Sequence, residues 1–199
     1  MNTLLSYVQT EIIVKKSRFI AEVFPVQNQG EARELLKEQK QKYKDSSHVV
    51  HAFFCGDQAQ VSGMSDDGEP AGTAGRPVFD VLKGESITNI LLTVTRYFGG
   101  TLLGTGGLVK AYGDAAKAVI SLAPIEPLVK RLFFTYTVDY EIHELIKRRI
   151  ADLPISSLKE DFSSRVAVSG LIENTSVSFL CSRITDSSHG KVQVFVTET

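Results

Sequence analysis

The sequence has 199 residues, of which 43% are hydrophobic and 23% are charged. These proportions are typical of a folded globular protein and exclude wholesale disorder, and the length suffices for one large domain or two small ones. Lysine and arginine total 22 against 23 aspartate and glutamate residues, so the formal net charge is -1. No broad electrostatic attraction to nucleic acid or anionic lipid therefore follows, and a polyanion would need a local patch.

The two cysteines and the N-terminal residues indicate the cellular compartment. Cys55 and Cys181 have no CxxC spacing, which favours reduced thiols over a disulfide framework or a zinc site. Charged residues interrupt the apolar positions of residues 1–19, so the sequence predicts neither a secretory signal nor a membrane span. We expect a cytoplasmic protein with no membrane partner.

The first two thirds of the chain alternate between strand and helix patterns. The patterns predict strands at residues 11–26, 48–55 and 87–98, and helices at residues 29–44 and 106–122. Eleven of the 15 glycines lie from Gly63 to Gly113. The alternation indicates an α/β or α+β fold.

Two prolines at residues 123–127 follow the last of these helices, which is typical of an interdomain linker. We therefore expect one domain at 1–124 and a second at 125–199. The second has the βαββαβ order of a ferredoxin-like domain. Its predicted elements are a strand at 129–140, a helix at 141–151, strands at 155–162 and 165–172, a helix at 174–185 and a strand at 191–196.

The acidic segment at residues 65–77 has the highest density of candidate functional side chains. Asp66, Asp67 and Glu69 lie within four residues, and Thr73 precedes a predicted helix start. Crowded carboxylates are tolerated when they are solvated, paired with arginine or bound to a hard cation such as Mg²⁺. A solvated loop with a helix cap is favoured, an arginine-paired loop is second, and a metal site is least favoured.

A second candidate is the glycine-rich segment that links a strand to a helix. Backbone amides at such a helix start can bind an anion, and phosphate is the natural ligand class. Neither a Walker A motif nor a dinucleotide fingerprint is present. An anion site and a tight turn with close backbone packing are equally favoured. The glycines concerned are Gly99, Gly100, Gly104, Gly106 and Gly107.

Strand alternation predicts where Arg96 points. It shares a face with Ile90, Leu92, Val94 and Phe98, which is the apolar face. A guanidinium at the edge of a core needs a partner, and Asp66, Asp67 and Glu69 are the nearest candidates. The acidic and glycine-rich segments are therefore expected to meet in space.

Three further groups have a simple structural interpretation. His48 and His51 fall on opposite faces of an extended segment, so a shared metal is not expected, and no nucleophile-base-acid set can be assigned. Cys55 is expected to be a small buried hydrophobe. The cluster at residues 15–18 is expected to be a charged strand edge.

The segments 65–77 (SDDGEPAGTAGRP) and 95–112 (TRYFGGTLLGTGGLVKAY), together with 15–20 (KKSRFI), resemble motifs of the IMPACT/YigZ family. The resemblance implies a ribosomal-protein-like β-α-β domain, similar to the fourth domain of elongation factor G. It also implies a ferredoxin-like C-terminal domain similar to the fifth. Only His48 remains of the histidine-rich stretch that usually precedes the aromatic strand of the family.

This resemblance suggests a translation-associated factor that binds RNA or the ribosome through a phosphate-binding, glycine-rich surface. No reaction and no cofactor are assigned, a non-enzymatic role is favoured, and the oligomeric state is left open. One alternative is a metal-dependent enzyme acting on a phosphorylated or anionic small molecule, and another is a protein-interaction module. The ligand-binding candidates are His48, Asp66, Asp67, Glu69, Thr73, Arg76, Arg96, Tyr97, Gly99, Gly100, Gly104, Gly106, Gly107 and Lys110.

Overall fold

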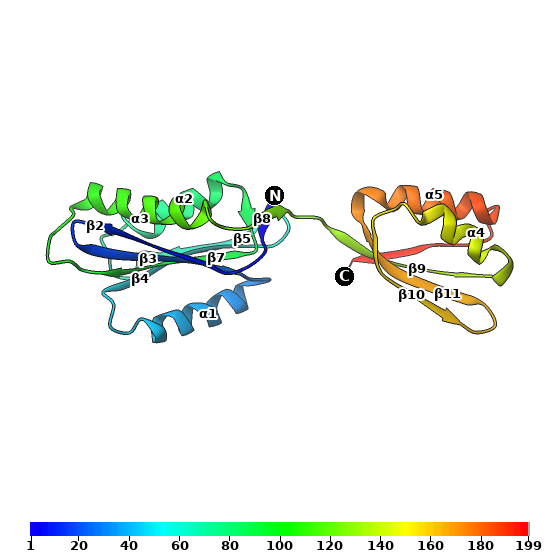
Figure 1. The fold of residues 1–199 in the computed structure, drawn as a ribbon, viewed down its shortest axis with the longest axis horizontal. Coiled ribbons are helices and arrows are strands. Elements are labelled where there is room, and N and C mark those ends of the chain that lie inside the picture. Colours follow the sequence, from blue (N-terminus) through cyan, green and yellow to red (C-terminus); the bar gives the residue numbers. More distant parts are fainter. Residues whose placement is uncertain (199) are drawn as a thin grey trace. The chain divides into compact units, whose positions relative to one another are not determined.

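The computed structural model describes residues 1–198, which form two compact units (Figure 1). The first spans Met1–Leu128 and the second begins at Val129. Both units combine strands and helices, which confirms the predicted α+β class. Among the described residues, no helix has both the length and the apolar character needed to cross a bilayer.

An antiparallel sheet with the strand order β2-β3-β7-β4-β5 forms the centre of the first unit. Figure 1 shows α2 (Gly75–Gly84) and α3 (Thr105–Ile120) on one face and α1 (Gln29–Lys42) on the other. The strands are β2 (Val8–Val14), β3 (Ser17–Pro25), β7 (Ile90–Tyr97), β4 (His48–Cys55) and β5 (Val61–Ser65).

The central strand β7 explains how this sheet is covered on both faces. Ile90, Leu92 and Val94 belong to the core beneath α2 and α3, whereas Leu91 belongs to the smaller core beneath α1. A strand buried on both faces has a nearly continuous apolar sequence. The remaining position on the α3 side of β7 is occupied by Arg96, which is also buried.

A sharp hairpin replaces the single strand that was predicted for residues 11–26. Strands β2 and β3 pair from Val8↔Val23 to Val14↔Ser17, and Lys15 and Lys16 form the turn. The prediction was wrong because Lys-Lys lacks the Asn-Gly or Asp-Gly signature of a two-residue turn. Lys15 and Lys16 therefore lie at a loop tip and not along an edge strand.

A small second sheet extends the first unit past the expected boundary at residue 124. Its strands are ordered β6-β1-β8, with bounds of β6 (Ile87–Thr88), β1 (Asn2–Leu4) and β8 (Ile125–Pro127). Of the two prolines that indicated a linker, Pro124 precedes β8 and Pro127 ends it, and a missing N–H is tolerated in such an edge strand. Because β8 pairs with β1, it belongs to the first unit.

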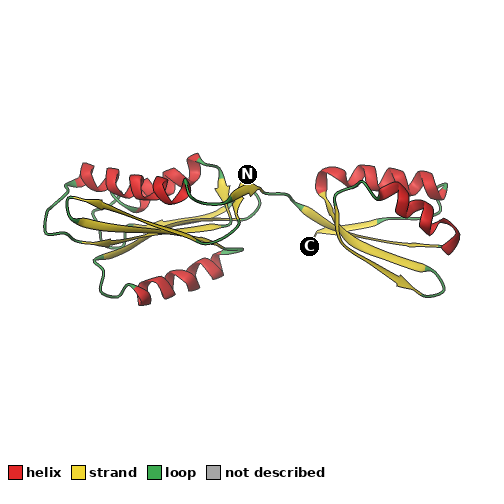
Figure 2. Cartoon of the chain, viewed as in Figure 1, coloured by secondary structure: helices red, strands yellow, loops and turns green. Residues whose placement is uncertain are grey.

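The second unit has the strand order β10-β11-β9-β12, with every neighbouring pair antiparallel. Figure 2 shows both helices on one face of the sheet. This order and the βαββαβ succession confirm the ferredoxin-like prediction. The elements are β9 (Arg131–Val138), α4 (Tyr140–Ile150), β10 (Ile155–Phe162), β11 (Val166–Glu173), η1 (Asn174–Ser176), α5 (Val177–Ser188) and β12 (Phe195–Glu198).

Two boundaries in this unit differ from the prediction. The helix expected at 174–185 begins as the short turn η1 and runs on to Ser188. The strand expected at 191–196 pairs with β9 only from Phe195 onward. Val192 and Val194 alternate like strand residues because they pack on the core, although they lie outside the paired strand.

Candidate functional site

The acidic and glycine-rich segments meet at a buried ion pair. The Nη1 atom of Arg96, on β7, lies 2.6 Å from Oε1 of Glu69, in the loop between β5 and α2. Both residues are less than one-tenth exposed. The structure thus confirms the predicted contact between the two segments and identifies Glu69 as the partner of Arg96.

Aromatic rings flank the guanidinium of Arg96. Its Cζ atom lies 5.6 Å from the ring centroids of both Phe19 and Phe98. Such cation–π contacts help to stabilise a desolvated guanidinium. Nη1 is the only nitrogen of this side chain with a hydrogen-bond partner among residues 1–198, and the buried Nε has none. Arg96 therefore has N–H groups that make no hydrogen bond within residues 1–198.

Tyr112 on α3 completes the contacts of Glu69. Its hydroxyl donates to Oε1 of Glu69 over 2.8 Å. Burial, followed by the nearby charge of Glu69, raises the pKa of Tyr112 far above its usual value. Tyr112 therefore stays protonated and acts as a fixed donor. Sequence reasoning missed this role, although Tyr112 falls on the inward face of α3 with Leu108 and Ala115.

His48 connects the ion pair to the acidic loop. Its Nδ1 lies 2.7 Å from the carbonyl oxygen of Asp67, which can only accept, so Nδ1 carries a proton. Its Nε2 lies 3.8 Å from Oε1 of Glu69. His51 falls on the opposite face of β4, where burial lowers its pKa to about 4. The expected separation of the two histidines is therefore observed.

Asp66 stabilises the start of α2 rather than binding an outside group. Its carboxylate accepts hydrogen bonds from the amides of Gly72, Ala74 and Gly75 over 2.8–3.0 Å. Burial acts to raise the pKa of Asp66, but these three bonds lower it overall. The expected cap is thus provided by Asp66. Thr73 instead donates its hydroxyl to the carbonyl of Pro70.

Asp67 has a different set of partners. Its carboxylate binds the Lys40 ammonium on α1 and accepts the Val49 amide over 2.7 Å. Burial opposes ionisation, but these partners lower the pKa of Asp67. Asp66, Asp67 and Glu69 thus point to separate partners. Among residues 1–198, no three His, Cys, Asp or Glu side chains are placed to hold a metal ion.

The glycines of the second segment have distinct local environments. A Cβ atom on Gly99 would lie 2.1 Å from the carbonyl carbon of Lys16, so only glycine fits this close backbone approach. Gly104 precedes α3 with a φ of 73°, which also favours glycine. Gly100 has a positive φ, and Gly107 lies near the Leu103 side chain. A Cβ on Gly106 would meet no atom within 4 Å.

A cleft of about 560 Å³ opens over the ion pair. Its polar lining includes His48, Glu69 and Arg96, and Gly104 with Thr105 brings the start of α3 to the same cleft. No side chain of the described residues caps α3, so the amides of its first turn remain available. Its apolar lining includes Phe98 and Leu102, which are 48% and 83% exposed and were not among the predicted ligand-binding residues.

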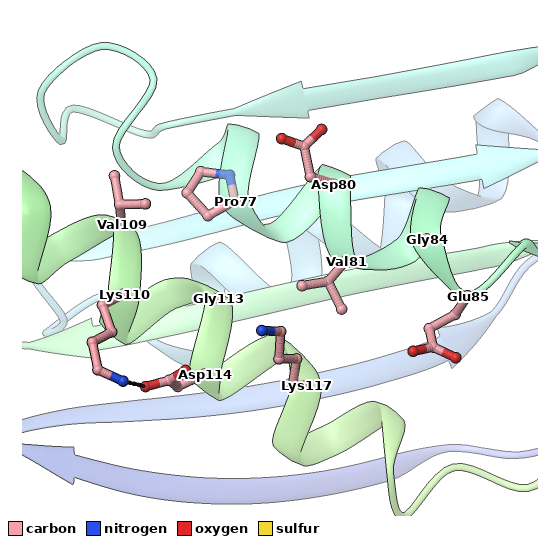
Figure 3. A pocket seen from close by; sticks show the side chains of 10 residues that line it. All are labelled: Pro77, Asp80, Val81, Gly84, Glu85, Val109, Lys110, Gly113, Asp114 and Lys117. Carbon is pink, nitrogen blue, oxygen red and sulfur yellow. Dashed lines mark hydrogen bonds and ion pairs between the residues drawn. The ribbon is translucent and has the colours of Figure 1, made fainter.

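Of the 14 predicted site residues, His48, Glu69, Arg96 and Gly104 line this cleft. Asp66, Asp67, Gly99, Gly100, Gly106 and Gly107 do not, and neither do four further residues. Arg76 pairs with Asp80 on α2, and Lys110 pairs with Asp114 on α3. Figure 3 shows Lys110 beside a second pocket, of about 630 Å³, between α2 and α3. The hydroxyl of the third residue, Tyr97, donates to Asp45. Thr73 is the fourth. The predicted surface of Arg76, Arg96 and Lys110 is therefore not formed as one cluster.

Residues 15–120 match the Impact N-terminal domain. A Haemophilus influenzae IMPACT family member is 35% identical over 189 residues, covering 93% of this chain and 91% of that protein. YigZ of Escherichia coli is 33% identical over 189 residues, covering 93% and 92%.

A crystal structure of a hypothetical protein shares the fold. It is 29% identical with a TM-score of 0.69, and the similarity covers 98% of this chain and 95% of the other. The domain match and the near full-length relatives agree with the acidic and glycine-rich motifs that meet at the cleft. The chain therefore belongs to the IMPACT family.

Proposed function

We propose that this protein is a translation-associated factor that binds single-stranded RNA, or an exposed RNA segment of the ribosome, without catalysing a reaction. The observation that carries the proposal is the convergence of two kinds of donor in one cleft. They are the uncapped amides of α3 and Nη2 of Arg96, which makes no hydrogen bond within residues 1–198. A helix start attracts an anion through its free N–H groups and its dipole, so a phosphate fits here.

The wall of the cleft favours RNA over an isolated phosphate ion. Phe98 presents an aromatic ring that is about half exposed, beside the buried guanidinium. Unpaired bases stack on exposed aromatic rings, and the positively charged groups of such sites follow the backbone. Phe98 would therefore receive a base while the start of α3 receives a neighbouring phosphate.

His48 adds a reason for RNA rather than DNA. Because Nδ1 donates to the Asp67 carbonyl, Nε2 is the ring nitrogen left for a hydrogen bond to a ligand in the cleft. The ribose 2′-hydroxyl is a donor that DNA lacks. The resemblance of the two domains to the fourth and fifth domains of elongation factor G supports a place in translation.

The geometry favours binding over metal-dependent catalysis. The catalytic alternative depends on Asp66, Asp67 and Glu69 acting on one ligand. Asp66 instead binds the start of α2, whereas Asp67 binds Lys40 and Glu69 binds Arg96. Arg76 and Lys110 lie outside the cleft, so we leave them out of the proposed site.

The test places a carboxylate at the start of α3. Gly106→Asp is accommodated because a Cβ there meets no neighbouring atom, and an acidic residue in a first helical turn is favourable. The same charge repels a phosphate. We expect Gly106→Asp to weaken binding of a fluorescent single-stranded RNA at least tenfold in anisotropy titrations, without lowering the melting temperature.

Gly106→Asn is the matched control because it has the same size and no charge. It should bind much more tightly than Gly106→Asp, and DNA of the same sequence should bind less tightly than RNA to the unaltered protein. Ribosome co-sedimentation provides a second readout. Equal RNA binding by both variants, or no association of the unaltered protein with RNA and ribosomes at low salt, would reject the proposal.

A further inference from the structure

The turn between β2 and β3 has an unfavourable backbone conformation for its sequence. Lys15 and Lys16 have φ angles of 44° and 69°, and Val14↔Ser17 closes the hairpin around them. A two-residue turn with both φ angles positive favours Asn-Gly, Asp-Gly or Gly-Gly. Side chains with a Cβ are strained in this left-handed region. The local fold therefore gives no reason for two lysines here.

The side chains of the turn carry two exposed ammonium groups. Lys15 and Lys16 are exposed, and neither ammonium makes an ion pair or hydrogen bond within residues 1–198. Lys40 and Lys42, by contrast, bind the carboxylates of Asp67 and Glu22. The turn thus carries two adjacent positive charges that no carboxylate in the described part of the chain neutralises.

The turn lies directly against the loop that forms one wall of the cleft. The backbone of Lys16 approaches Gly99 so closely that a Cβ on Gly99 would lie 2.1 Å from its carbonyl carbon. The Gly99 amide also donates to the Ser17 hydroxyl over 3.1 Å. Gly99 directly follows Phe98, which lines the cleft. The backbone of the turn is therefore held beside the loop that carries the proposed base-stacking surface, and its two exposed lysines are attached there.

We infer that Lys15 and Lys16 bind backbone phosphates of the RNA strand whose base stacks on Phe98. This inference rests on the proposed function and extends it from one phosphate at α3 to a run of nucleotides. Strained residues that the fold does not need are found where function requires them. A single strand fits because its phosphates flank each base, so neighbouring positive groups can follow the backbone.

The test replaces the turn with the residues that its backbone prefers. Lys15→Asn/Lys16→Gly should raise the melting temperature and weaken binding of single-stranded RNA at least fivefold. Each phosphate contact contributes about 0.7 to the slope of log affinity against log salt for a single strand. The slope for the double variant should therefore be shallower by about 1.4. A gain in stability with a loss of affinity is not expected from a purely structural turn.

Two matched variants separate charge from backbone geometry. Lys15→Arg/Lys16→Arg should keep RNA affinity within twofold, whereas Lys15→Gln/Lys16→Gln should lose it like the Asn-Gly variant. Lys37→Gln/Lys83→Gln removes two exposed charges elsewhere and should bind like the unaltered protein. Undiminished RNA binding by the folded Gln or Asn-Gly variant would overturn the inference, as would equal weakening by Lys37→Gln/Lys83→Gln.

The two proposals fail in different ways. If Gly106→Asp binds RNA normally while the Lys15 and Lys16 variants lose it, the turn binds phosphate and the cleft does not. If only Gly106→Asp loses binding, the cleft is supported and the turn inference is rejected. Absence of RNA binding by the unaltered protein rejects both.

Discussion

Arg96 is stable in a buried position because several groups compensate its charge together. Glu69 neutralises it, Tyr112 satisfies the same carboxylate oxygen, and Phe19 and Phe98 flank the guanidinium. A buried charge that loses its partner is strongly destabilising, whereas an apolar replacement of both partners is often neutral. The side chains that build the floor of the cleft therefore also hold the first unit together.

A double-mutant series tests this dependence. Arg96→Leu leaves Glu69 buried without its counter-charge and should lower the free energy of unfolding by about 3–5 kcal/mol. Arg96→Leu/Glu69→Leu removes both charges and should recover most of that loss. Urea titrations followed by circular dichroism give both values. Equal stabilities of the unaltered protein and Arg96→Leu would show that the ion pair does not support the fold.

His51 gives the stability a specific pH dependence. Burial, then the charge of Lys40, lowers the pKa of His51 to about 4, below the usual value of 6.5. The unfolded chain therefore takes up this proton first as the pH falls. The contribution of His51 is complete above about pH 6.5 and is lost toward pH 4, by about 3 kcal/mol at about 1.4 kcal/mol per pKa unit.

Calorimetry at pH 7.5, 6 and 4.5 provides the measurement. The unaltered protein should lose stability across this range, and His51→Gln should lose less because it has no proton to take up. His189 follows α5 and is exposed, so His189→Gln should keep the pH dependence of the unaltered protein. Parallel curves for His51→Gln and the unaltered protein would contradict the assignment.

At the scale of elements, β7 shows what the sequence could predict. Its alternation placed Arg96 on the apolar face, and the cost of a buried guanidinium then called for a carboxylate from the acidic segment. This reasoning predicted that Arg96 forms an ion pair with the acidic segment. It could not choose among Asp66, Asp67 and Glu69, because that choice depends on how the loop after β5 reaches α2.

The elements that the sequence did not reveal depend on long-range pairing or unusual turn residues. The β2–β3 turn was missed because Lys15 and Lys16 adopt a conformation usually left to glycine and asparagine. Strand β8 was missed because its prolines resemble a linker until β1 is seen to pair with it. The partners of Asp67 could not be predicted for the same reason, since Lys40 and Val49 contact it from distant positions in the sequence.

Helix α3 shows how one element serves both the core and the proposed site. Leu108 and Tyr112 lie on its buried face, and its uncapped start lines the cleft. Gly106 has no steric reason to be glycine, although glycine is unfavourable in a helix. The phosphate that we propose to bind at the start of α3 would account for this residue, whereas Gly99 is explained by the approach of Lys16 alone.

At the scale of the whole molecule, each unit has its own core. The first unit has two cores, one beneath α1 and one beneath α2 and α3. The second unit has a separate core between its helices and its sheet. The net charge of -1 gives no general attraction to RNA. Binding must therefore come from local geometry, and all the groups that we propose for it belong to the first unit.

The first unit alone should therefore fold and bind RNA. Residues 1–128 keep β8, whereas residues 1–124 lose the pairing of β8 with β1. We expect 1–128 to unfold cooperatively and to reproduce the effect of Gly106→Asp on RNA affinity. Residues 1–124 should melt at a lower temperature. Thermal circular dichroism and anisotropy titrations measure both, and a folded 1–128 that does not bind RNA, although the full chain does, would move the binding surface to the second unit.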